Sequence, residues 1–145
     1  MLDVVATGLS KLESSVLAGW AGGPVYPLIS GLHVLSIGFV VVPIMLADLR
    51  ILQLGEADAR ARAHARLALV SFGAAAVTGG LLFTVQPVEY AENRAFAIKI
   101  ALMAAAGLNA GVFGTLSGSQ RAAAILSATL WLGVLFAGRW IAFVV

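Results

Sequence analysis

Residues 26–49 read YPLISGLHVLSIGFVVVPIMLADL, and no formal charge interrupts this stretch before Asp48. An α-helix of about 20 mostly apolar residues is long enough to cross a membrane hydrocarbon core of roughly 30 Å. Apart from Tyr26 at its start, His33 is the single ionisable side chain before Asp48 in the stretch. The sequence therefore predicts a first membrane span over residues 26–49.

Three further stretches are long and apolar enough to span a membrane, at residues 67–86, 96–116 and 122–145. The connections between the spans cover residues 50–66, 87–95 and 117–121, which leaves no room for another domain. Small residues such as Gly79, and the pair Gly107 and Gly111, would let helices approach closely in lipid. The expected fold is all-α, an integral membrane four-helix bundle over residues 26–145.

Residues 1–20 precede the first span and have a different pattern. Apolar side chains recur every three or four positions, at Leu2, Val5, Leu9, Leu12, Val16 and Trp20. Polar side chains occupy the opposite face, which predicts an amphipathic helix. A helix lying in the membrane interface fits this pattern, and a helix packed on the rim of the bundle fits it equally well. Because the first charge is Asp3 and polar residues interrupt the segment, it does not resemble a cleavable signal peptide.

The composition excludes several classes of function. Charged residues make up 11% of the chain and hydrophobic residues 61%, whereas soluble domains carry about 25% charged residues. The net charge of +2 comes from basic residues in short connections, which is not a nucleic-acid-binding face. The absence of cysteine excludes thiol chemistry and iron–sulfur ligation. No phosphate loop, nucleophile elbow or zinc-protease motif is present, so we expect no catalytic activity from this chain alone.

Basic residues are concentrated on one side of the predicted bundle. The first and third connections contain Arg50, Arg60, Arg62, Arg66 and Arg121. On the other side, Lys11 and Arg94 are offset by acidic residues. The positive-inside rule assigns the arginine-rich connections to the cytoplasm. We therefore expect a multi-pass protein of the bacterial inner membrane with both termini in the periplasm.

Ionisable side chains inside a span are costly and are therefore candidates for function. His33 lies about 10 Å below the start of the first span, and Met103 lies at a similar depth in the third. Lys99 is one turn above Met103, and Arg139 lies in the last two turns of the fourth span. The depths of these four residues predict one site in the outer half of the bundle.

A haem b site is the leading interpretation of this group, with His33 as axial ligand, Met103 or Lys99 opposite, and Arg139 or Lys99 beside the propionates. His64 lies on the cytoplasmic side, about 24 Å or more from His33, so one subunit cannot hold haem between two histidines. A five-coordinate iron bound by His33 and a dimer sharing His33 remain open. The structural alternative is a histidine hydrogen-bonded to a neighbouring helix, with Met103 as packing. Copper is a weaker possibility because few methionines and no cysteines are present.

Asp48, Arg50 and Asn109 are predicted to be structural polar residues. Asp48 and Arg50 belong to an Asp-Leu-Arg motif at the cytoplasmic end of the first span. One interpretation is a proton or headgroup site. The other, which we favour from the sequence, is a buried carboxylate paired with an arginine that fixes the helix end.

Several short motifs, spread from about residue 20 to the end, carry a resemblance. They are Leu32-His33-Val34-Leu35, Asp48-Leu49-Arg50-Ile51-Leu52, Tyr90 to Asn93 with Phe96 and Lys99, Leu108-Asn109-Ala110, and Ala137-Gly138-Arg139-Trp140-Ile141-Ala142. The chain resembles an uncharacterised family of small bacterial four-helix membrane proteins, with a general likeness to copper-resistance-D and b-type cytochrome bundles. The resemblance implies that His33, Asp48, Arg50, Lys99, Asn109 and Arg139 form the polar framework. Ser36, Phe143 and Gly114 depart from the family pattern. At Gly114 the resemblance leads us to expect a histidine or basic residue, and if that residue is a ligand in the family, this member has lost a cofactor that its relatives hold.

Three hypotheses of function follow. The first is a small membrane subunit that binds haem b and passes electrons between a periplasmic donor and the quinone pool or an oxidase. The second is a structural or assembly subunit of a larger membrane complex, without a cofactor of its own. The third is a transporter of copper or a small solute. The expected partners are the lipid bilayer, other membrane subunits or further copies of the chain, and quinone.

Overall fold

The computed structural model describes residues 2–113 and 119–143, and every regular element in these two ranges is helical. The α-helices are α1 (Leu2–Glu13), α2 (Val16–Ala21), α3 (Tyr26–Leu54), α4 (Ala59–Val85), α5 (Pro87–Glu92), α6 (Arg94–Leu108) and α7 (Gln120–Trp140). A π-helical turn, η1 (Asn109–Phe113), continues α6, and a 3-10 turn, η2 (Ile141–Phe143), continues α7. The prediction of an all-α chain is confirmed for these residues.

Three helical segments are long and apolar enough to cross a membrane: α3, α4, and α7 together with η2. The third predicted span corresponds to α6, which reaches a spanning length of about 30 Å only together with η1. Its predicted end, residues 114–116, and the last two residues of the fourth span, 144–145, lie outside the described residues.

The connection predicted over residues 50–66 is much shorter than expected, because the two flanking helices extend into it. Gly55 ends α3 in the left-handed conformation, with φ of 87°, which glycine adopts without steric cost. The side chain of Asp58 then caps α4 by accepting a hydrogen bond from the backbone amide of Ala61 at 2.8 Å. Only residues 55–58 lie outside the two helices. The arginines at 60, 62 and 66 therefore lie on the first turns of α4.

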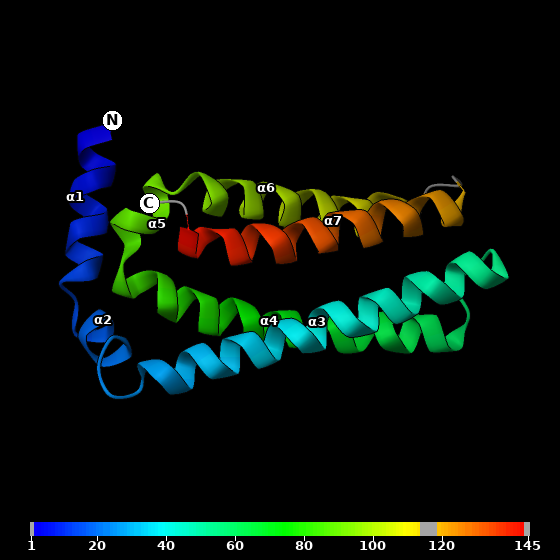
Figure 1. The fold of residues 1–145 in the computed structure, drawn as a ribbon, viewed down its shortest axis with the longest axis horizontal. Helices are drawn as coiled ribbons and strands as arrows, with labels where there is room; N and C mark the ends of the chain where they lie inside the picture. The colour runs from blue at the N-terminus through cyan, green and yellow to red at the C-terminus, as the bar shows by residue number, and fades with distance from the viewer. Residues whose placement is uncertain (1, 114–118, 144–145) are drawn as a thin grey trace.

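The long helices lie side by side as two antiparallel pairs (Figure 1). α3 packs along α4, α6 packs along α7, and contact between α3 and α7 joins the two pairs. Phe72 of α4 meets Trp131 of α7 edge to face, with 6.3 Å between ring centroids. Phe96 of α6 packs on Phe83 of α4 and Tyr90 of α5, with centroid distances of 5.7 and 5.4 Å. Aromatic contacts thus link α4 to both helices of the other pair.

Small residues supply much of the packing between helices. The buried apolar residues are mostly alanine and valine, among them Ala47, Ala68, Ala75, Ala106, Ala124 and Val134. A Cβ placed on Gly133 of α7 would lie 3.2 Å from Cδ1 of Leu102, which shows how closely α6 approaches. A Cβ placed on Gly107 or on Gly111 would have no described atom within 4 Å. A side chain at either glycine would therefore meet open space among the described residues.

The N-terminal segment forms two helices rather than the single helix predicted over residues 1–20. The chain turns at Ser14 and Ser15, and the Ser15 hydroxyl caps α2 by accepting a hydrogen bond from the amide of Ala18 at 3.2 Å. α1 packs against α5, and α2 packs against α4. Figure 1 shows α1 running across the ends of the long helices, at the end where α7 finishes.

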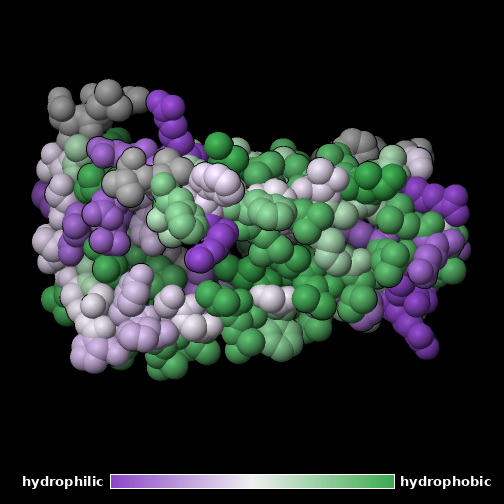
Figure 2. All heavy atoms as spheres, viewed as in Figure 1, coloured by the Kyte–Doolittle hydropathy of each residue, from purple (hydrophilic) through white to green (hydrophobic). Residues whose placement is uncertain are grey.

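Apolar side chains cover the outside of the long helices. Leu35, Val70, Ile98 and Phe136 are all more than half exposed. Figure 2 shows hydrophobic residues across the middle of one face, with hydrophilic residues gathered at the two ends. This distribution is the one that a protein surrounded by lipid requires, because its hydrocarbon-facing surface has no need of polar groups.

Candidate functional site

His33 of α3 is held by a side chain of the neighbouring helix. Its Nδ1 lies 3.0 Å from the Oγ1 atom of Thr78 on α4. The hydroxyl hydrogen of Thr78 is already donated to the carbonyl oxygen of Ala74 at 2.8 Å. Because a hydroxyl has one hydrogen to donate, Thr78 accepts at His33, and Nδ1 carries the hydrogen. In the neutral imidazole the lone pair is then on Nε2.

The His33 ring lies directly on the backbone of α4. A Cβ placed on Gly79 would lie 2.9 Å from Cε1 of His33 and 3.5 Å from its Nδ1. Real Cβ contacts are not this short, so any larger residue at position 79 would displace the ring. Gly79 and Thr78 therefore determine together where the imidazole of His33 lies.

Lys99 is the charged residue that acts electrostatically on His33. It lies on α6, and the end of its side chain runs along α7, where a Cβ on Gly138 would lie 3.6 Å from the Nζ atom. Within residues 2–113 and 119–143, Lys99 forms neither a hydrogen bond nor an ion pair. His33 therefore contacts α4 within one helix pair, and Lys99 contacts α7 within the other.

The other two residues predicted for this site have different surroundings. The guanidinium of Arg139 lies over the ring of Phe143, with Cζ 5.5 Å from the centroid, and its side chain is exposed. Met103 is half-buried on α6, one turn from Lys99. His64 is on the first turns of α4, about 21 Å along that helix from Thr78. Lys99 is therefore within electrostatic reach of His33, while the guanidinium of Arg139 packs on Phe143 at its own helix end.

The predicted pairing of Asp48 with an arginine does not occur among the described residues. Arg50 instead binds Asp58, with Nε 3.1 Å from each carboxylate oxygen and Nη2 in contact with Oδ2. Hydrogen bonds from Arg50 and from the amide of Ala61 hold the pKa of Asp58 below its ordinary value. The physical reason is position: Arg50 is close to the end of α3, so its side chain meets the residue that caps α4.

Asp48 and Asn109 are instead buried against one face of α7. Asp48 faces the hydroxyl of Ser127. The Nδ2 atom of Asn109 donates a hydrogen bond to the carbonyl of Ala123 at 3.0 Å. Ala123 and Ser127 are one turn apart on α7, so both polar groups meet the same stretch of that helix.

Three residues of these sites escaped the sequence analysis: Thr78, Asp58 and Ser127. Thr78 is eight residues before Gln86, the predicted outer end of its span, and His33 is seven residues after Tyr26. The same depth argument that grouped His33 with Met103 would have paired Thr78 with His33. Asp58 precedes an alanine-rich helix and follows Gly55, which is the usual signal for a helix start. For Ser127 the sequence offers no comparable signal.

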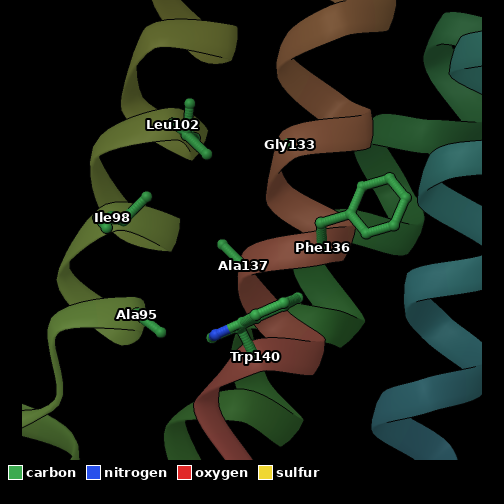
Figure 3. A pocket seen from close by; sticks show the side chains of 7 residues that line it. All are labelled: Ala95, Ile98, Leu102, Gly133, Phe136, Ala137 and Trp140. Atoms are coloured by element: carbon green, nitrogen blue, oxygen red, sulfur yellow. The ribbon is translucent and has the colours of Figure 1, made fainter. Parts of the chain in front are cut away.

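An apolar groove lies between α6 and α7 near the end of α7. Figure 3 shows Ala95, Ile98 and Leu102 of α6 facing Ala137 and Trp140 of α7. A second groove, between α3 and α4, is lined by Leu32, Leu35, Ser36, Phe39, Val70, Ser71 and Ala74. Neither groove is lined by His33 or Lys99. Both grooves are open along the apolar outer surface of the molecule.

The donor set decides which ligands the chain can hold. Within the described residues, no group of three or more histidine and acidic side chains is placed to hold a metal ion. His33 offers one nitrogen ligand with its other ring nitrogen anchored, which is the arrangement seen at metal-binding histidines. Gly114, the position at which a histidine or basic residue was expected from the sequence, lies outside the described residues. A comparison of the chain with protein-family models, with curated proteins and with solved structures finds no match.

Proposed function

We propose that this chain is an integral membrane protein with four spans, formed by α3, α4, α6 with η1, and α7 with η2. The exposed apolar surface along the long helices supports this proposal. The arginines of the α3–α4 end and of the start of α7 would face the cytoplasm. Both termini would then face the periplasm of a bacterial inner membrane, with α1 in the membrane interface.

Within that frame, the function we propose is a small redox subunit with haem b at His33. The observation that supports it is the orientation of His33: Thr78 anchors Nδ1, and the lone pair is left on Nε2. A bound haem supplies one-electron transfer, here between a periplasmic donor and the quinone pool or an oxidase. Lys99, which has no ion pair among the described residues, is the candidate for the opposite ligand or for a propionate partner, and Met103 is the alternative ligand.

An absorption spectrum of the purified, dithionite-reduced protein tests this proposal. We expect a Soret band in the native chain and in the control variant His64→Ala, and its loss in His33→Ala. Thr78→Val removes the acceptor at Nδ1 but keeps the shape of the side chain, so it should shift the spectrum without abolishing it. A native sample without a Soret band and without iron by elemental analysis would overturn the proposal.

The second candidate function is a structural or assembly subunit without a cofactor. The hydrogen bond between His33 and Thr78 also supports this candidate, because it ties α3 to α4 without any ligand. A cofactor-free chain that co-purifies at fixed stoichiometry with a larger membrane complex would favour it. A cofactor-free chain that remains alone in mild detergent would contradict it.

A further inference from the structure

At the α3–α4 end of the long helices, two buried oxygen atoms have no hydrogen-bond partner among residues 2–113 and 119–143. They are Oδ2 of Asp48 on α3 and Oδ1 of Asn109 at the start of η1. The two side chains are only 7% and 5% exposed. Both atoms are acceptors, so whatever completes this site must donate hydrogen bonds or carry positive charge.

The described part of the chain does not provide a cation for Asp48. Arg50, two residues away, is bound to Asp58, and this is the only ion pair among the described residues. The charged and titratable groups of this end, on the two helices packed against α3, are Arg60, Arg62, His64 and Arg66 of α4 and Arg121 of α7. None of these forms an ion pair with Asp48, and the Arg121 side chain lies against Gly55. An ionised carboxylate left alone at such burial costs several kcal/mol.

The local backbone of α6 changes at the same place. The helix switches from α to π at Asn109, and π-turns of this kind are frequent at functional sites. Carboxylate, amide and hydroxyl oxygen atoms are therefore supplied from three segments: α3, η1 and α7. In membrane transporters, places where a helix departs from regular α geometry coordinate sodium ions or protons through freed backbone carbonyls.

We propose that Asp48, Asn109 and Ser127 form a binding site for a monovalent cation, a proton or a sodium ion, between α3, η1 and α7. The cation compensates the buried carboxyl of Asp48. Asn109 keeps its Nδ2 bond to Ala123 and turns its free oxygen to the site. This inference does not depend on a haem at His33, which lies about 22 Å away along α3.

Infrared spectroscopy of the full chain in lipid nanodiscs tests the site through the stretching band of protonated carboxyls. We expect the native chain in sodium-free buffer to show such a band above about pH 6, where exposed carboxyls are ionised. Asp48→Asn should lose this band, whereas the control Glu56→Gln, at an exposed acid of the α3–α4 connection, should keep it. If sodium removes the band at constant pH, the cation is sodium; if the band does not respond to sodium, the cation is a proton.

Ser127→Ala provides a second test in which the carboxyl of Asp48 is retained. Ser127→Ala should shift the frequency of the carboxyl band, because Ser127 faces Asp48. The matched control Ser71→Ala, in the groove between α3 and α4, should leave the frequency unchanged. The proposal is overturned if the native chain and Asp48→Asn give the same carboxyl bands across the pH range, with sodium and without it.

Discussion

At the proposed cofactor site, the imidazole of His33 lies against the backbone of α4 at Gly79. Replacing Gly79 by alanine places a Cβ 2.9 Å from Cε1 of His33, so the imidazole must move away from Thr78. We expect Gly79→Ala to lower stability by about 1–3 kcal/mol, the usual cost of overpacking. Gly80→Ala is the matched control, since nothing lies within 4 Å of its Cβ, and it should raise stability by up to about 1 kcal/mol. Equal effects of the two changes on unfolding in detergent would contradict the geometry.

The ion pair of Asp58 and Arg50 makes a prediction about pH. Because the folded-state pKa of Asp58 is below its ordinary value, its stabilisation is complete above about pH 4 and is lost as pH falls toward the folded-state value. Asp58→Asn keeps an N-cap for α4 but removes the charge. The variant should therefore melt lower than the native chain at neutral pH, with the difference shrinking in acid. A difference in Tm that is constant from neutral to acid pH would count against the ion pair, and Glu56→Gln serves as control.

The residues that the sequence could identify were those that are unusual in an apolar span. His33, Asp48 and Asn109 stood out because a polar or ionisable group at that depth is costly. Their partners did not stand out, because Thr78 and Ser127 are ordinary in membrane helices. The expected pairing of Asp48 with an arginine does not occur among the described residues, because Arg50 lies at the end of α3 and binds Asp58.

At the scale of single elements, the long apolar helices were predictable and their ends were less so. α4 begins at Ala59, eight residues before the predicted span, because Asp58 caps it and the alanines between its arginines favour helix. The π-turn at Asn109 carries no signature in composition or periodicity. It depends on tertiary contact, since the side chain of Asn109 is bonded to α7.

Asn93 allows a prediction about how α6 begins. Its Oδ1 caps α6 by accepting from the amides of Ala95 and Phe96, and its Nδ2 donates to the carbonyl of Ile141 in η2 at 3.1 Å. Asn93→Asp keeps the cap and loses the donor, while Asn93→Ala loses both. We expect each lost function to cost about 1 kcal/mol, so the alanine variant should be the less stable of the two. Equal unfolding free energies for the two variants would show that the cap contributes nothing, and an Asn93→Asp variant as stable as the native chain would show the same for the bond to η2.

At the scale of the whole molecule, charge and apolar surface are divided between the ends and the middle. The α3–α4 end holds Arg50, Arg60, Arg62 and Arg66, and the opposite end holds α1 and α5 with Glu89 and Glu92. The sequence could predict this division, because it follows from hydropathy and the positions of charges. It could not predict that the helices pack as two pairs, since that arrangement depends on which small residues face each other.

The proposed membrane topology makes a last prediction, which single cysteines can test because the chain has none of its own. Glu56 is exposed in the connection before α4, and Glu92 is exposed at the end of α5, which follows the other end of α4. In intact spheroplasts a membrane-impermeant maleimide should label Glu92→Cys, and it should label Glu56→Cys only after lysis.

Val70, in the middle of α4, is 74% exposed in the isolated chain, so Val70→Cys would react at once in water. In lipid it should stay unlabelled before and after lysis, because no water reaches it there. Labelling of Val70→Cys in intact spheroplasts would mean that α4 does not cross the membrane, and a reversal of the two end positions would place the termini in the cytoplasm.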